Sequence, residues 1–244
     1  MANPGYVPCY GLLLAAGSSR RFGSDKRMHP LPDPEAPAAG STPVGLRTVQ
    51  QWLSVCSPAD QAPGSQTANT LDHLYVVSRP DDAFAALIEK TLMQDDQAQA
   101  PCTLLAATDA ALGMGHSLAS AVALMPPGAL IIGLADMPWV RPATLSVLAR
   151  KLRESPNDAI LKPRYQGKSG NPLGFGPMHQ AALEQCCGDE GARALVRHAQ
   201  ASGSLLDIDV DDSGILYDID HPADLTDAAR SSAQAREVTR EREK

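Results

Sequence analysis

The sequence predicts an α/β fold with a mostly parallel sheet that carries helices on both faces. Short apolar stretches of strand length alternate along the chain with longer stretches of helical spacing, as in βαβ units. The first stretch, residues 10–15, is apolar on both faces, which is typical of a central parallel strand. The chain has 244 residues, 43% of them hydrophobic, which is enough to bury one core of this kind.

Each expected element has the length and the residue pattern of its type. Further strands are expected at residues 71–78, 102–107, 130–135 and 159–163. Helices are expected at residues 44–56, 81–93, 117–125, 142–152, 178–187 and 191–200. The first of these helices places Leu46, Val49 and Leu53 on one face, and Asp81 lies near the start of the second.

The remaining segments are expected to be loops, a hairpin and a terminal helix. Residues 28–43 are rich in proline and are predicted to form an irregular surface loop, and residues 165–176 a loop and hairpin strand within a substrate lid. Residues 205–219 are predicted to form a β-hairpin around a turn at 211–214, followed by a helix from Pro222. The domain is expected to span residues 5–230, and the polar residues 231–244 to form a disordered tail.

Composition narrows the classes of function. The net charge of -7 argues against a general nucleic-acid binder, because phosphate backbones require basic surfaces. The five cysteines show no metal-ligand spacing, which indicates reduced thiols in a cytoplasmic protein. No apolar run approaches the length of a membrane span, so no membrane partner is expected.

The first expected strand continues into a basic loop that contains glycine. Gly17 and Gly23 would allow backbone N–H groups to approach phosphate oxygens without obstruction by a Cβ atom. Arg21 and Lys26 would add positive charge. The spacing differs from that of a Walker loop and of a dinucleotide fingerprint, and a solvated basic turn is the alternative interpretation.

An acidic residue, Asp136, follows the expected strand 130–135. Ligands of open α/β sheets bind at the carboxyl ends of the strands. A carboxylate at that edge would repel a triphosphate unless a cation lay between them, so Asp136 is predicted to bind Mg²⁺. A loop hydrogen bond or a helix cap is the alternative for this side chain.

Several of these segments resemble one family. The pattern L-A-A-G-x-S-x-R-x-G-x-x-K is matched by Leu14, Ala15, Ala16, Gly17, Ser19, Arg21, Gly23 and Lys26. It is similar to the N-terminal signature of the molybdenum cofactor nucleotidyltransferases, and of the cytidylyltransferases among them. Residues 113–118, 188–193 and 218–225 resemble later motifs of the same family. The resemblance implies a single Rossmann-like nucleotidyltransferase domain.

The resemblance also implies a reaction and a set of site residues. The reaction is the transfer of CMP from CTP to the molybdopterin cofactor, with release of pyrophosphate, and Lys26, Arg21 and Asp136 are the expected catalytic residues. Nucleotide binding is expected at Leu14, Ala15, Ala16, Gly17, Ser18, Ser19, Arg21, Gly23, Lys26, Gly113 and Ser117. Substrate binding is expected at Gly170, Asn171 and Arg193. Asp136 and Asp220 are the expected Mg²⁺ ligands, with Asp218 as the competitor for the second position and acidic capping of a helix as the alternative role.

The chain departs from the family pattern at a few positions. Phe22 replaces a commoner Met, Asn171 replaces a His, His221 replaces a helix-capping Thr, and a short G-K-P turn after Lys26 is missing. Two alternatives therefore stay open. One is a nucleotidyltransferase that uses another triphosphate or a sugar-phosphate-like acceptor. The other is a non-catalytic chaperone that binds the molybdenum cofactor and delivers it to a client molybdenum enzyme.

Overall fold

The computed structural model describes residues 6–17, 19, 21–32, 41–57, 70–94 and 101–225. Ser18, the expected domain limits and the expected tail lie outside these residues, as does most of the expected helix from Pro222. The strands of the main sheet are β1 (Cys9–Leu14), β4 (His73–Ser78), β5 (Cys102–Ala106), β6 (Ala129–Leu134), β7 (Ile160–Tyr165), β8 (Lys168–Ser169), β9 (Leu173–Phe175) and β10 (Leu205–Asp209). The α-helices are α1 (Val44–Leu53), α2 (Ala83–Gln94), α3 (Met114–Val122), α4 (Pro142–Glu154), α5 (Gln180–Leu183) and α6 (Arg193–Ser202).

The main sheet is mostly parallel, as the sequence predicts. Its strand order is β10-β7-β9-β6-β1-β4-β5, with β8 paired to β7. Strand β1 lies at the centre and pairs in parallel with β6 on one side and β4 on the other. Strand β9 is antiparallel to both of its neighbours, β6 and β7.

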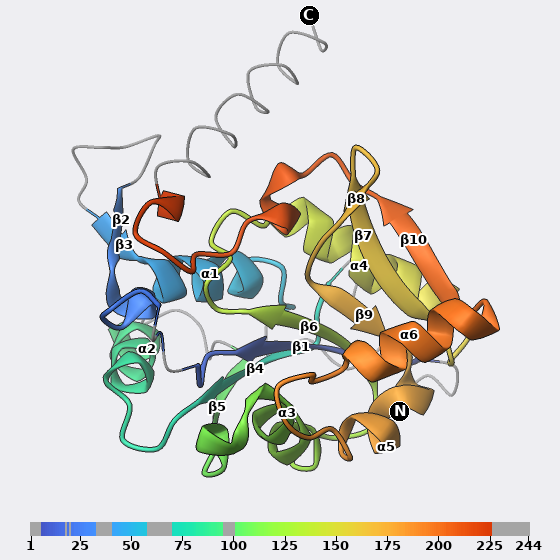
Figure 1. The fold of residues 1–244 in the computed structure, drawn as a ribbon, viewed down its shortest axis with the longest axis horizontal. Helices are drawn as coiled ribbons and strands as arrows, with labels where there is room; N and C mark the ends of the chain where they lie inside the picture. The colour runs from blue at the N-terminus through green and yellow to red at the C-terminus, as the bar shows by residue number, and fades with distance from the viewer. Residues whose placement is uncertain are drawn as a thin grey trace, which may run out of the picture.

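Helices cover both faces of this sheet (Figure 1). Alternate residues of β1 point to opposite faces, so Cys9 and Leu13 belong to one core cluster and Leu12 to another. The first cluster packs against α1, α2 and α4, and the second against α3, α5 and α6. The α/β layer arrangement expected from the sequence is confirmed.

Two strand glycines bring α1 close to the sheet. A Cβ atom on Gly11 of β1 would lie 2.9 Å from the Trp52 ring, and one on Gly133 of β6 would lie 2.5 Å from it. Trp52 of α1 is buried at 2% exposure between these two positions. A side chain larger than that of glycine at position 11 or 133 would therefore collide with the indole ring.

The predicted hairpin at residues 205–219 is wrong. Strand β10 pairs in parallel with β7, and the segment after it forms a short 3-10 helix, η5 (Ser213–Leu216). The buried Asp212 carboxylate accepts hydrogen bonds from the backbone N–H groups of Gly214 and Arg141 and from the Thr144 hydroxyl, at 3.0, 2.8 and 2.6 Å. These bonds hold the segment against the start of α4, so it cannot return along β10.

Smaller differences concern helix starts and the proline-rich segment. Helix α3 begins at Met114, before the expected start at residue 117, so Ser117 lies inside the helix. At the start of α2, Asp82 rather than Asp81 accepts the N–H of Phe84, at 3.1 Å. The proline-rich segment begins at the end of η1 (Lys26–Met28) and contains a short antiparallel pair, β2 (Pro30–Pro32) and β3 (Ser41–Pro43). None of the helices in the described ranges has both the length and the apolar character needed to cross a lipid bilayer.

Candidate active site

The order of the strands reverses at β1, and a cleft lies at this point. The chain runs from β1 outward to β4 and β5, and then returns to place β6 on the opposite side of β1. Loops that leave the carboxyl ends of two such strands diverge and leave a crevice. A cleft of about 610 Å³ lies there, between the loops after β1, β5 and β6.

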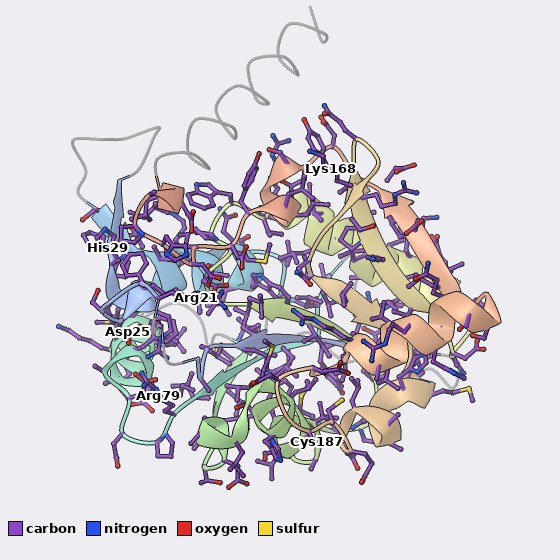
Figure 2. All side chains as sticks on the ribbon, in the orientation of Figure 1. Arg21, Asp25, His29, Arg79, Lys168 and Cys187 are labelled. Atoms are coloured by element: carbon purple, nitrogen blue, oxygen red, sulfur yellow. The ribbon has the colours of Figure 1, made fainter. Side chains whose placement is uncertain are left out.

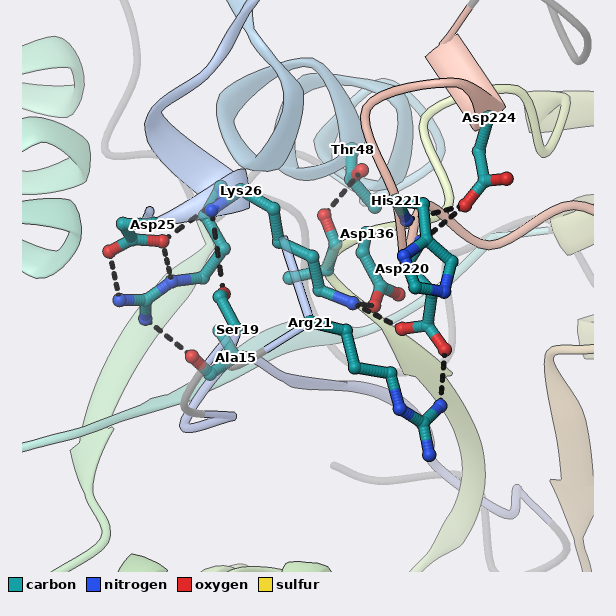
Figure 3. A network of polar contacts seen from close by, with 12 residues as sticks. Ala15, Ser19, Arg21, Asp25, Lys26, Thr48, Asp136, Asp220, His221 and Asp224 are labelled. Carbon is teal, nitrogen blue, oxygen red and sulfur yellow. Dashed lines mark hydrogen bonds and ion pairs between the residues drawn. The ribbon is translucent and has the colours of Figure 1, made fainter. Parts of the chain in front are cut away.

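The cleft contains a compact group of charges (Figure 3). The Lys26 ammonium lies between two carboxylates, 2.5 Å from Asp136 Oδ2 and 3.0 Å from Asp220 Oδ1. Arg21 Nη1 contacts the other oxygen of Asp220 at 3.0 Å. The Lys26 and Asp136 side chains are largely buried, whereas Arg21 is 73% exposed. Three segments that lie far apart in the sequence thus converge on one point.

Burial and charge shift the pKa values of this group in different directions. Burial lowers the pKa of Lys26, but Asp136 and Asp220 together outweigh it, so this pKa lies above its ordinary value. Desolvation raises the pKa of Asp136, and Asp218 adds to this, although Lys26 opposes both. The hydrogen bond from Lys26 and the nearby Arg21 hold the pKa of Asp220 below its ordinary value.

The backbone around Asp136 is held from three sides. The N–H of Ala135 donates to Leu14 of β1 at 3.1 Å, and its carbonyl accepts from the Thr48 hydroxyl of α1 at 2.9 Å. The Asp136 carbonyl accepts the N–H of Ile219 at 3.1 Å, which places Asp218 and Asp220 beside it. The acid at the end of β6 and the acids after η5 therefore keep a fixed separation.

The carboxylates suit a divalent cation. Asp136 Oδ1 is buried and has no hydrogen-bond partner in the described part of the chain. Among the described residues, no group of three or more His, Cys, Asp or Glu side chains is arranged as a metal centre. One or two carboxylates completed by substrate phosphates are the usual ligands of Mg²⁺, and Asp136 and Asp220 provide this number.

The loop after β1 is anchored by an aromatic side chain. Phe22 is buried with Leu31, Val44, Trp139 and Ile219 in a small apolar cluster at the side of the cleft. Gly23 has φ +82°, a left-handed conformation that glycine adopts readily, and the chain turns there towards Lys26. This turn lets the loop leave the cleft at Arg21 and return to it at Lys26.

The second glycine loop is packed on the segment before α6. A Cβ atom on Gly113 would lie 2.7 Å from the Asp189 carboxylate, and one on Gly115 would lie 2.5 Å from the Cys187 carbonyl. The Gly115 N–H donates to the Gly188 carbonyl at 2.7 Å. This close contact brings Asp189 and Arg193 into the lining of the cleft.

Most of the residues expected from the sequence line the cleft. They are Leu14, Ala15, Ala16, Gly17, Ser19, Arg21, Lys26, Gly113, Ser117, Asp136, Arg193 and Asp220, together with the competitor Asp218. Gly23, Gly170 and Asn171 are outside the lining. The N–H of Asn171 donates to the Ile215 carbonyl at 2.9 Å, so this segment is packed against η5.

The sequence interpretation missed several lining residues, namely Arg27, Ala110, Ala111, Leu112, Met114, Leu134, Ala135 and Asp189. Asp189 belongs to a motif that was recognised, and Arg27 directly follows Lys26, so both had a signal in the sequence. Residues 110–112 form a short 3-10 helix, η3 (Ala110–Leu112), after β5, and their small apolar side chains give no sign of a site.

The chain is similar in sequence and in fold to several known proteins. The chain is 29% identical over 215 residues to the purine catabolism protein PucB of Bacillus subtilis (strain 168), across 87% of this chain and 91% of that protein. In fold it is similar to a nucleotidyl transferase from Methanothermobacter thermautotroptrophicus, with a TM-score of 0.65 and 17% identity over 93% of this chain and 98% of that one.

It is also similar in fold to Rv0371c from Mycobacterium tuberculosis H37Rv, with a TM-score of 0.61 and 22% identity over 89% of this chain and 95% of that one. A structure of Rv0371c in complex with manganese matches with a TM-score of 0.53 and 22% identity, over 84% of this chain and 89% of that one. The family model described as the MobA-like NTP transferase domain matches residues 11–203. Since this match spans most of the chain, the protein belongs to the family of MobA-like NTP transferase domains.

Proposed function

We propose that this protein transfers CMP from CTP to the molybdopterin cofactor in a Mg²⁺-dependent reaction that releases pyrophosphate. The observation that carries the proposal is the placement of Lys26 between Asp136 and Asp220 at the strand-reversal point of the sheet. A lysine with two acids at a cleft of this size suits a triphosphate bound with a cation.

The reaction is a displacement at the α-phosphorus. An oxygen of the acceptor phosphate forms a bond to this atom, the bond to the bridging oxygen of the β-phosphate breaks, and pyrophosphate leaves with the bonding electrons. The protein needs no covalent nucleophile for this reaction, because positioning and neutralisation of charge supply the catalysis. Mg²⁺, held by Asp136 and Asp220, would neutralise charge on the phosphate oxygens.

Lys26 and Arg21 are assigned to the leaving pyrophosphate. A lysine ammonium has three donors, of which two face Asp136 and Asp220, so one remains for a phosphate oxygen. Among the described residues, Arg21 forms an ion pair only through Nη1, with Asp220. The rest of its exposed guanidinium can bind a phosphate bidentately. Gly17 and Ser19 of the same loop would contribute backbone N–H groups.

The base is assigned to the end of the cleft opposite Asp136. Because β5 lies beyond β4 from β1, residues 110–113 line the end opposite Asp136. The Leu14 carbonyl and the Ala15 N–H are already bonded to Ala135 and Val77, at 3.1 and 2.8 Å. The backbone N–H and carbonyl of Ala16 are therefore the groups assigned to the base edge.

The acceptor is assigned to the side of the cleft formed by α6. Arg193 lines the cleft and would pair with the acceptor phosphate. Gly170 and Asn171, expected from the resemblance to bind substrate, lie outside the lining. The manganese complex of Rv0371c supports a divalent cation in a related fold.

A turnover assay tests the proposal. The purified protein is supplied with each nucleoside triphosphate, Mg²⁺ and either molybdopterin cofactor or a sugar phosphate, and pyrophosphate release is measured. We expect release only with CTP, Mg²⁺ and the pterin together. Release with the sugar phosphate would instead support the other nucleotidyltransferase reaction. Tight binding of the pterin without any pyrophosphate release would support the chaperone.

The first prediction concerns the preference of the enzyme for CTP over GTP. The Ala16 methyl group narrows the start of the loop relative to glycine, which disfavours a purine, and an unpaired polar group on the wrong base adds to this cost. We expect kcat/KM for CTP to exceed that for GTP at least about tenfold, equivalent to roughly 1.4 kcal/mol. The substitution Ala16→Gly should narrow this ratio. Equal use of the two triphosphates by the wild type would contradict the cytidylyl assignment and leave the metal site untouched.

A further inference from the structure

Arg27 lines the cleft but differs from the other basic residues there. It is 2% exposed, although it directly follows Lys26 in the sequence. Judged by its charge and place alone, it would be taken for another phosphate ligand. Its hydrogen bonds contradict that role.

All five N–H donors of the Arg27 guanidinium are used inside the protein. Nε donates to Asp25 Oδ1 at 2.8 Å, and Nη2 donates to Asp25 Oδ2 at 2.5 Å and to Asp82 Oδ1 at 3.0 Å. Nη1 donates to Asp82 Oδ2 at 2.6 Å and to the backbone carbonyl of Ala15. The guanidinium carbon also lies 5.0 Å from the centre of the Phe84 ring. No donor remains for a ligand.

These bonds connect the loop after β1 to the start of α2. Asp82 accepts the N–H of Phe84 at the start of α2, and Figure 2 shows Asp25 and Arg79 beside this helix. Asp25 is the acceptor at the start of η1, where Lys26 lies. The Ala15 carbonyl is at the end of β1, in the cleft and next to Ala16. The Arg27 side chain therefore holds the peptide between Ala15 and Ala16 in place.

We propose that Arg27 is a positioning residue that holds the Ala15–Ala16 peptide at the base end of the cleft, and thereby sets how tightly the nucleoside part of a triphosphate binds. The inference rests on the proposed function for the identity of the nucleotide. It assigns Arg27 no contact with the phosphates.

The phosphate end of the cleft should not depend on the Arg27 side chain. The cap of η1 is a bond from the backbone N–H of Arg27 to Asp25 Oδ1, at 3.1 Å, which survives a change of side chain. The N–H of Lys26 has its own acceptor, the Ser19 hydroxyl, at 3.4 Å. Lys26 also keeps both of its carboxylate partners. Loss of the guanidinium therefore frees the Ala15 carbonyl and leaves Lys26 where it is.

Three variants separate positioning from general stability. Arg27→Lys keeps the positive charge but has three donors for five acceptors and lacks the planar fork. The double variant Arg27→Met, Asp82→Asn removes the buried cation and one buried anion together, so that Asp82 is not left unpaired. Arg79→Met is the matched control, since Arg79 lies 3.7 Å from both Asp25 and Asp82 but makes no hydrogen bond to Ala15.

The test compares the affinities for Mg²⁺–CTP and for Mg²⁺–pyrophosphate by calorimetric titration. We expect Arg27→Lys and the double variant to bind CTP about tenfold more weakly, and to bind pyrophosphate within about twofold of the wild type. Arg79→Met should bind both ligands like the wild type. If Arg27→Lys lost affinity for CTP and for pyrophosphate to the same extent, Arg27 would be a phosphate ligand and the proposal would be overturned. Unchanged affinity for CTP would also overturn it.

The two Arg27 variants and the wild type also distinguish a failure of this inference from a failure of the proposed function. If the double variant does not fold, Arg27→Lys decides the question alone. If the wild type binds CTP but releases no pyrophosphate with any acceptor, the proposed reaction fails. The ratio of CTP to pyrophosphate affinity still tests Arg27 in that case.

Discussion

Asp136→Asn is expected to reduce Mg²⁺-supported turnover by about a thousandfold or more, since cation stabilisation of the transition state contributes several kcal/mol. A neutral amide is a far poorer ligand for a hard cation than a carboxylate. Asp136 Oδ1 is buried without a partner among the described residues, so it is the oxygen most available to a cation. The measurement is kcat at saturating Mg²⁺ and CTP, together with the affinity for Mn²⁺ alone.

The fold should tolerate this substitution. Lys26 keeps Asp220 as a partner at 3.0 Å, so its charge is not left unpaired. The bond from the Ile219 N–H to residue 136 involves the backbone and is unaffected. Asp220→Asn should also reduce turnover strongly, and Asp218→Asn less so, because Asp218 is exposed and Asp220 contacts Lys26. If Asp218 proves essential and Asp220 dispensable, the assignment of the second ligand is wrong.

The centre of the fold could be predicted because its signals are local. A strand that is apolar on both faces and is followed by a glycine loop identifies β1 and the loop after it from a few adjacent residues. Asp136 could be recognised for a similar reason, since an acid after a buried strand must lie at the carboxyl edge of the sheet. The alternation of strands and helices then specifies the parallel pairing.

The errors came from interactions between distant segments. The segment 205–219 has the alternation of a hairpin, but Asp212 binds Arg141 and Thr144, about seventy residues earlier in the chain. The charge of Arg27 and its place next to Lys26 give no sign that its side chain is buried, and its bonds to Asp82, 55 residues later, account for that burial. Such pairings depend on tertiary packing, which no local pattern records.

Lys26→Ala is expected to lower kcat/KM for the triphosphate by about a hundredfold or more, a loss typical of removing one preorganised charge from a transition state. Lys26 is the group that neutralises Asp136 and Asp220, and without it these carboxylates and Asp218 would repel the phosphates. The affinity for pyrophosphate should fall in the same variant, in contrast to the expected behaviour of Arg27→Lys. The measurements are steady-state kinetics and a pyrophosphate titration.

The melting temperature distinguishes this effect from unfolding. The Lys26 side chain lies in the cleft and outside the apolar core clusters, so its removal should affect stability far less than turnover. Lys90→Ala is the matched control, because Lys90 is an exposed lysine of α2 that lies outside the lining of the cleft. A folded Lys26→Ala variant with wild-type turnover and pyrophosphate affinity would remove Lys26 from the active site. It would leave Arg21 as the remaining candidate for the leaving pyrophosphate.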